Sequence, residues 1–427
     1  MTKKISLISF LIFVFLIPFC ITWTNIFLYV SMLFVVIDKD LYKKFSLKKL
    51  NGEGKSFVFI SSVYIVFCVV SLFWSDDSNR GFQLIGRYIL IAVFPWFLSF
   101  LKVVGVLKNF KQPIYAFILG VLCSSVVCLY LSYQDCWIET ENGVIFKPDT
   151  YTRDLGMIES ISFGFNHFSY NLLSHFIHPS YFSLYFLISF ILIINQIFET
   201  KKTYLKIIFI CFCVYSLVFI YLLQSRSNFI AFICLIFVYV IFYAYLKKRF
   251  IYLICGFALV LVVSYGLISD SRLAIIVNLY NENSEKIENN ESYSSLNARI
   301  IIWRNAIQVI KQHPILGVGI GDTDTELEKQ YKKNGVDFEF GTHNQYIYAQ
   351  LSMGVIGLLL LLAMFFPAFY YGIKNRYFPL IGFSVAVMIN LLFENMLTRN
   401  AGLMFIPWAT MLLLMMSEEK KKEISNE

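Results

Sequence analysis

Long apolar runs, separated by polar segments, follow one another along most of the chain. They lie at about 5–21, 24–37, 56–74, 84–101, 113–133, 179–197, 207–222, 228–246, 251–268, 345–366, 379–396 and 403–416. A helix needs roughly 20 apolar residues to cross the hydrocarbon core of a bilayer, whereas membrane β-barrels show short alternating segments. The pattern therefore predicts an all-α, polytopic membrane bundle of about twelve transmembrane helices, with eleven or thirteen as alternatives.

Lysine and arginine gather in one set of the segments between the runs. These clusters lie at 3–4, 39–55, 102–111, 201–206, 247–249, 374–376 and 420–422. With about twelve spans, all of them fall on one face of the membrane, which the positive-inside rule assigns to the cytoplasm. Both termini are then expected in the cytoplasm. The first run resembles a signal peptide but lacks a small-residue cleavage site, so we interpret it as a retained helix.

Two larger polar segments, at about 134–178 and 269–344, fall on the opposite face, and the longer one precedes the tenth span. It contains a predicted helix at 294–312, which Pro314 and the glycines after it end. We therefore expect three parts. Residues 1–268 form nine spans and the shorter periplasmic loop, 269–344 form a large periplasmic loop with helices, and 345–427 form three spans and a cytoplasmic tail.

The composition narrows the function classes. Of the 427 residues 58% are hydrophobic and 15% charged, against about 45–50% and 25% in soluble domains, so a water-soluble or disordered chain is excluded. The net charge of +8 comes from clusters between the spans rather than from one groove-binding face, so we expect no nucleic-acid partner. The nine cysteines lie mostly inside the runs, without a CxxC pair or Cys/His cluster, which predicts neither a disulfide framework nor a metal site.

Residues able to carry chemistry gather around the long loop. One face of its predicted helix, at spacings i, i+4 and i+7, presents Arg299, Trp303 and Ala306. The loop closes with His343-Asn344, and the next span carries Gly354 and Gly357. Glycines three apart let a neighbouring helix approach closely. We expect that approach to hold His343 at the membrane surface.

Three segments carry a resemblance to a known family. They are Asn297–Ala306, His313–Gly319 and the signature His343-Asn344-x9-Gly354-x2-Gly357. They resemble the O-antigen ligase and polymerase superfamily, at motif level over about 205–360 and elsewhere only in hydropathy. The resemblance implies that a glycan linked to undecaprenyl diphosphate moves to an acceptor hydroxyl on the periplasmic face of the bacterial inner membrane, without a metal or another cofactor. In ligases the acceptor is a sugar of the lipid A core; in polymerases it is another repeat unit.

The chemistry of such a transfer assigns roles to the candidates. A diphosphate leaving group carries negative charge, which arginine binds bidentately, and the attacking hydroxyl must give up a proton. We therefore expect Arg226 and Arg299, with Arg304 as a third candidate, to bind the donor diphosphate. His343 is expected to act as the general base. Weaker candidates for substrate binding are Asn344, His178, Arg80 and Arg87.

Several of these features also have a purely structural interpretation. Arg226 lies between two apolar runs and would then mark a helix end at the lipid headgroups. Glu394 and Arg399, at the outer end of the eleventh span, would pair only with each other. The Asp322-Thr323-Asp324 segment has the DxD form of a metal motif, but we favour N-capping of the helix that follows.

The ligase interpretation is favoured because the signature is complete and one external loop dominates. Polymerases often carry two arginine-bearing loops, so Arg153 in the loop at 134–178 keeps a polymerase as an alternative. A protein O-oligosaccharyltransferase shares the same motifs. A polysaccharide transporter, a different class, usually shows repeated halves and ionisable residues near the bilayer midplane. The expected partners are the lipid-linked donor, a lipid A-core or glycan acceptor, and membrane lipids.

Overall fold

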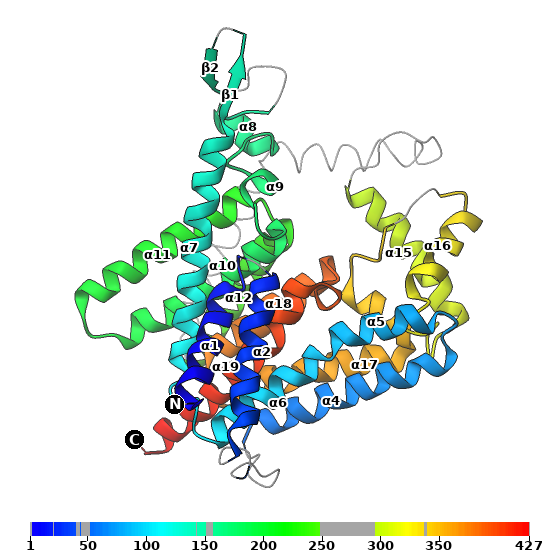
Figure 1. Cartoon of the computed structure of the whole chain (residues 1–427), viewed down its shortest axis with the longest axis horizontal. Helices are drawn as coiled ribbons and strands as arrows, with labels where there is room; N and C mark the ends of the chain where they lie inside the picture. Colours follow the sequence, from blue (N-terminus) through cyan, green and yellow to red (C-terminus); the bar gives the residue numbers. More distant parts are fainter. Residues whose placement is uncertain are drawn as a thin grey trace.

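The structure is a computed structural model, and it describes residues 2–19, 21–39, 43, 52–141, 143–150, 157–247, 295–336 and 340–426. Helices account for almost all of this part of the chain (Figure 1). The predicted ninth span at 251–268, the first part of the long loop and Arg153 lie outside the described residues.

The described apolar runs coincide with helices. The first group is α1 (Thr2–Leu16), α2 (Ile21–Ile37), α4 (Gly54–Val70), η2 (Ser71–Trp74), α5 (Ser78–Tyr88), α6 (Leu90–Val103), α7 (Lys111–Asp135), α10 (Pro179–Glu199), α11 (Thr203–Leu222) and α12 (Arg226–Lys247). The second group is α17 (Gln345–Lys374), α18 (Phe378–Phe393), η3 (Met396–Thr398) and α19 (Asn400–Asn426).

Eight helical stretches among the described residues are long and apolar enough to cross a membrane. They are Gly54–Trp74, Ser78–Val103, Lys111–Asp135, Pro179–Glu199, Thr203–Leu222, Arg226–Ala244, Gln345–Lys374 and Asn400–Glu423. The helices Trp23–Ile37 and Phe378–Phe393 are apolar but shorter. The expectation of a helical membrane protein is therefore confirmed, while the count of twelve spans and the periplasmic loop remain predictions.

Large aromatic side chains pack where α7, α10 and α19 meet. Phe117 of α7 stacks on Phe405 of α19 with ring centroids 4.8 Å apart, and Tyr185 of α10 lies 4.7 Å from Phe405. Trp408, one turn further along α19, is also buried. Burial of such large apolar surfaces holds α19 among its neighbours, so the first residues of α19 are fixed where the candidate site forms.

The remaining elements extend beyond the membrane helices. An antiparallel hairpin of β1 (Trp137–Thr140) and β2 (Gly143–Phe146) continues from the end of α7, followed by the short α8 (Met157–Phe163) and α9 (Tyr170–Leu173) (Figure 1). Well apart from the hairpin, α15 (Ser295–Gln312) and α16 (Thr323–Lys333) lie beside the ends of α5 and α17 (Figure 1). The helix expected at 294–312 is confirmed as α15.

A loop between α15 and α16 interrupts α17. The backbone at Gly354 leaves the helical region, with φ at 63° and ψ at −164°. The N–H groups of Val318 and Gly319 donate to the carbonyls of Leu351 and Ser352, at 3.0 and 2.9 Å. A Cβ at Gly354 would lie 2.0 Å from a carbonyl oxygen of this loop. The interpretation of Gly354 as a helix–helix contact is therefore wrong, because the glycine admits a loop.

Apolar packing around the same loop, through its residue Val318, also joins α15 and α16 to the bundle. Ile302 and Ala306 of α15, Leu327 and Tyr331 of α16, and Leu351 of α17 form one buried apolar cluster. Because α17 begins two residues after His343, this packing sets where α15 lies relative to that histidine.

Candidate functional site

Several membrane helices have their ends in one polar layer. α5, α10, α12, α17 and α19 begin in this layer, and α18 ends there. Ser227 Oγ donates to Asn390 Oδ1 at 2.9 Å, joining α12 to α18. The backbone N–H of Leu397 donates to Gln345 Oε1 at 2.9 Å, joining η3 to α17. All four residues are buried, so these hydrogen bonds fix the helix ends relative to one another.

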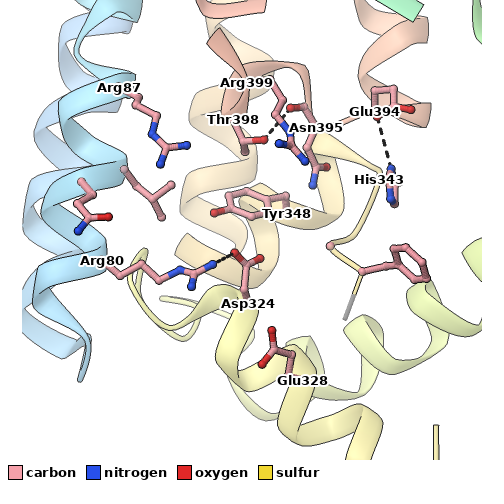
Figure 2. A pocket seen from close by; sticks show the side chains of 14 residues that line it. Arg80, Arg87, Asp324, Glu328, His343, Tyr348, Glu394, Asn395, Thr398 and Arg399 are labelled. Carbon is pink, nitrogen blue, oxygen red and sulfur yellow. Dashed lines mark hydrogen bonds and ion pairs between the residues drawn. The ribbon is translucent and has the colours of Figure 1, made fainter. Parts of the chain in front are cut away.

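A cavity of about 440 Å³ opens in this layer (Figure 2). It is lined by Arg80, Gln83, Leu84 and Arg87 of α5, Asp324 and Glu328 of α16, Phe340, Gly341, His343 and Tyr348, and Glu394, Asn395, Thr398 and Arg399. In Figure 2, the arginines of α5 approach the cavity from one side, and His343 with Glu394 from the opposite side. The volume is in the range of sites that hold small organic ligands.

His343 has an unusual backbone at the edge of the cavity. Its φ is 45°, in the left-handed region that residues other than glycine rarely adopt and that surrounding contacts must enforce. The next residue, Asn344, is the N-cap of α17: its Oδ1 accepts the N–H groups of Tyr346 and Ile347 at 3.0 and 3.1 Å. Asn344 is buried and does not line the cavity. Its place in the structure is that of a helix cap that holds His343 in position.

Glu394 connects two of the expected site residues. Its Oε2 lies 3.4 Å from His343 Nδ1, and its Oε1 lies 3.7 Å from a terminal nitrogen of Arg299. The carboxylate is 18% exposed, so little water weakens these interactions. A carboxylate at Nδ1 favours the tautomer with the proton on that nitrogen, which leaves Nε2 able to accept a proton.

The face of α15 that carries Arg299 and Trp303 turns toward the segment that contains His343. Arg299 reaches Glu394, as described, and Trp303 Nε1 donates to the carbonyl oxygen of Thr342 at 2.9 Å. Thr342 Oγ1 in turn donates to Asn395 Oδ1 at 3.0 Å. α15 therefore contacts both the segment that carries His343 and the segment that carries Glu394.

Arginines from two elements reach the cavity. Arg80 and Arg87 lie two turns apart on α5, and Arg80 forms an ion pair with Asp324. Arg399 comes directly before α19. Arg87 and Arg399 form no ion pair with any residue that the structure describes. The expectation that Glu394 and Arg399 pair only with each other is wrong, because Glu394 faces Arg299 and His343 instead.

The Asp322-Thr323-Asp324 segment joins α16 to α5. The carboxylate of Asp322 accepts the backbone N–H groups of Asp76 and Asp77, at 2.6 and 2.8 Å. It makes no side-chain hydrogen bond to α16 itself, so the expected N-capping role is wrong. Among the described residues, no group of three or more His, Cys, Asp or Glu side chains is arranged to hold a metal ion.

Arg226 and Arg304 do not line the cavity. Arg226 is the first residue of α12, is exposed, and precedes Ser227, which bonds to Asn390 one turn before Glu394. Arg226 thus belongs to the same polar layer. Arg304 is exposed on α15, on the side away from the buried cluster of Ile302 and Ala306.

His178 caps α10. The backbone N–H of Ser180 donates to its Nδ1 at 3.3 Å, which requires that nitrogen to be unprotonated. The pKa of His178 is lowered, chiefly because the ring loses water around it. The charge of Glu394 opposes this shift, while His343 and Arg399 add to it. The ring is therefore neutral at neutral pH and lies within electrostatic range of the site.

Two cavity residues, Glu394 and Arg399, had no assigned chemical role in the sequence. Both are ionisable residues at the outer end of the apolar run 379–396, and ionisable residues at membrane depth usually have a function. That signal marks the position but not the partner, because Glu394 meets His343 across 51 positions of the chain. Tyr348, also in the cavity, gave no signal, since tyrosine is common at membrane interfaces.

The fold and the site define a polytopic membrane protein with a charged cavity at the ends of its helices. Residues 211–362 match the family described as O-antigen ligase. This match confirms the resemblance to the O-antigen ligase and polymerase superfamily, and it supports a membrane enzyme of the glycan-transfer type. The matched segment contains Arg226, Arg299 and His343.

One curated protein also matches part of the chain. An uncharacterized protein of Haemophilus influenzae is 34% identical over 93 residues, which amount to 21% of this chain. The aligned segment spans 23% of that relative's length.

Proposed function

We propose that this chain transfers a glycan from undecaprenyl diphosphate to an acceptor hydroxyl, on a sugar of the lipid A core, at the periplasmic face of the bacterial inner membrane. The observation that carries the proposal is the cavity where His343, next to Glu394, faces a set of arginines. The family match supports the same type of transfer.

The proposed step is an inverting displacement. The acceptor oxygen attacks the anomeric carbon as the bond from that carbon to the diphosphate oxygen breaks, and His343 takes the hydroxyl proton. The diphosphate leaves with the electron pair of the broken bond. Such a base is typically worth about 10²–10⁴-fold in rate. Glu394, 3.4 Å from Nδ1, then stabilises the imidazolium that forms.

The donor diphosphate is assigned to the arginines on the α12 and α15 side of His343. Arg299 lies against Glu394 and is 24% exposed, and Arg226 lies in the same polar layer. Guanidinium groups in a partly dry site stabilise the charge that grows on the leaving diphosphate, and no metal is needed for that task. We leave Arg304 out of the proposed site because it lies on the side of α15 away from the buried cluster, whereas Arg299 on the same helix reaches Glu394.

The position of the charged residues favours surface chemistry over transport. Arg226 is the first residue of α12, and His343 comes two residues before α17 begins. Both therefore lie at helix ends, whereas transporters usually place their ionisable residues in broken helices near the midplane.

The acceptor class separates three enzymes that share the motifs. The complete signature and the dominant loop favour a ligase; a polymerase and a protein O-oligosaccharyltransferase are the alternatives. A deletion strain, examined by gel for lipopolysaccharide and lipid-linked glycan, tests the proposal. We expect loss of polymer from the lipid A core together with accumulation of lipid-linked chains.

The other outcomes each contradict the ligase assignment. A core carrying one repeat unit would identify a polymerase, and altered glycoproteins with normal lipopolysaccharide would identify an oligosaccharyltransferase. An unchanged glycan profile would reject glycan transfer altogether.

Complementation with Arg299→Gln is expected to fail, while the matched Arg304→Gln variant, a neighbour on the same helix, is expected to restore the wild-type pattern.

A further inference from the structure

Two arginines of the cavity form no ion pair with any described residue, and Glu328, the third carboxylate of the lining, lies across the cavity from both (Figure 2). Arg80 is paired with Asp324, and Glu394 is occupied by Arg299 and His343. Arg87 and Arg399 line the same cavity and form no ion pair within the described part of the chain. Positive side chains that converge without a counter-ion on the protein provide a site for an anion.

The two guanidinium groups come from different elements and share one space. Arg87 ends the cavity-lining face of α5, and Arg399 directly precedes α19, whose first N–H groups carry partial positive charge. Figure 2 shows both side chains extending into the cavity, with Tyr348 beside them. Asn395 and Thr398 line the wall next to Arg399, and their polar side chains suit the neutral hydroxyls of a sugar.

The proposed reaction separates this site from the donor diphosphate. Inversion requires the acceptor oxygen and the leaving diphosphate to lie on opposite sides of the anomeric carbon. Arg226 and Arg299, assigned to the diphosphate, do not line the cavity, whereas Arg87 and Arg399 do. With His343 at the boundary as the base, the cavity is the side from which the acceptor approaches.

We infer that Arg87 and Arg399 bind a phosphate or carboxylate group on the acceptor glycan, so that the enzyme selects an anionic acceptor. This inference rests on the proposed function, because it takes the cavity as the acceptor side. Both anions have oxygens that match the bidentate geometry of guanidinium. A neutral acceptor would leave the two arginines without a partner, and this difference provides the selection.

Binding to the full-length protein in detergent, measured by calorimetry, tests the inference without requiring turnover. The probes are glucose 6-phosphate, glucuronic acid and, as the neutral control, glucose; farnesyl diphosphate represents the lipid diphosphate. The wild-type protein is expected to bind the two anionic sugars at least about tenfold more tightly than glucose, because charge-assisted hydrogen bonds contribute that much.

The variants assign the anion to one source. Arg87→Gln and Arg399→Gln are each expected to lose most of the preference for the anionic sugars and to bind farnesyl diphosphate as the wild type does. Arg299→Gln is expected to show the reverse, with about a tenfold loss for farnesyl diphosphate alone. Arg376→Gln, at the opposite end of α17, removes one exposed guanidinium and is expected to change neither. Thermal unfolding of each variant shows whether it still folds. Arg87→Lys and Arg399→Lys keep the positive charge, so they separate an effect of the charge from an effect on folding.

Two binding results would overturn the inference. The first is equal affinity of the wild type for glucose and glucose 6-phosphate. The second is that Arg87→Gln or Arg399→Gln loses affinity for farnesyl diphosphate as Arg299→Gln does. The second result would place the donor at these arginines. An unchanged glycan profile in the deletion strain would reject the proposed function and the acceptor assignment with it, even where binding stays selective for anionic sugars. The two failures are therefore distinguishable.

Discussion

Glu394 is the residue through which the expected base and the expected phosphate-binding arginine meet. Its two oxygens face His343 and Arg299 at 3.4 and 3.7 Å. When one carboxylate serves both partners, it can orient the imidazole and at the same time limit where the guanidinium lies. In the proposed mechanism Glu394 is a positioning residue that acts through these two side chains.

We expect Glu394→Gln to lower the rate of glycan transfer by about 10- to 100-fold, because each charge-assisted hydrogen bond contributes roughly 1.5–3 kcal/mol. The amide keeps the shape and loses the charge. Transfer is measured as attached polymer in a complemented deletion strain. His343→Ala, which removes the base, is expected to lose about 10²–10⁴-fold.

The double variant separates positioning from an independent role. If Glu394 acts through His343, then adding Glu394→Gln to His343→Ala lowers the rate far less than it does in the wild type. Full additivity of the two losses would show that Glu394 does not act through His343.

At this scale the sequence singled out His343 and Arg299, which the structure brings to one carboxylate. His343 and Arg299 carry the motif, and helix periodicity put Arg299 and Trp303 on one face, as the structure confirms. Periodicity says nothing about partners on other helices, so the contacts of Glu394 and the convergence of Arg87 with Arg399 follow only from the packed bundle. The chemical roles of all these residues remain predictions.

Among the elements, α16 is joined to the segment before α5 by a buried carboxylate, in addition to its apolar packing. Asp322, 8% exposed, accepts two backbone N–H groups from the segment before α5. Asp322→Ala leaves both donors without a partner, and we expect a loss of about 1–3 kcal/mol in stability. The measurement is the thermal unfolding midpoint in detergent. Asp322→Asn keeps one acceptor oxygen and is expected to lose less; equal stability of the alanine variant and the wild type would contradict this assignment.

The loop that enters α17 depends on Gly354. Its φ of 63° disfavours any side chain, and a Cβ there would lie 2.0 Å from the carbonyl oxygen of Ile315. We expect Gly354→Ala to destabilise the protein by more than about 2 kcal/mol and to abolish transfer, because α17 carries Tyr348 and begins at the site. Unfolding and transfer are measured together.

The matched control is Gly86→Ala in α5, where an added Cβ meets nothing within 4 Å. Alanine is a better helix former than glycine, so stability is expected to stay equal or rise by about 0.5–1 kcal/mol. Equal behaviour of the two alanine variants would mean that the loop does not require glycine at 354. The sequence showed that this glycine mattered but not why, since a loop and a helix both need a residue without a side chain.

Across the whole molecule, the two ends of the bundle differ in chemistry. One end contains the cavity. The other is basic and joined by polar contacts: Lys102 pairs with Glu418 at 2.8 Å, and Asn375 donates to Glu53 at 2.5 Å. Asn375 also donates to Ser417 Oγ at 2.9 Å, so these contacts bring together the residue before α4, the last turn of α6, the residue after α17 and the last part of α19. Several of the Lys/Arg clusters that the positive-inside rule assigned to one face of the membrane therefore lie in segments that the fold brings to the end opposite the cavity.

The absolute orientation is a prediction that the fold does not determine, because contacts fix which segments share an end but not which end faces the cytoplasm. We expect Lys108, after α6, in the cytoplasm and Lys333, at the end of α16, on the outer face; both side chains are exposed. Lys108→Cys and Lys333→Cys in the full-length protein are treated with a membrane-impermeant maleimide in cells whose outer membrane is opened, with the wild type as the background for the native cysteines. Labelling of Lys333→Cys before lysis, and of Lys108→Cys only after it, is expected. The reverse pattern would put the cavity on the cytoplasmic side, where a lipid-linked glycan exported for assembly could not reach it.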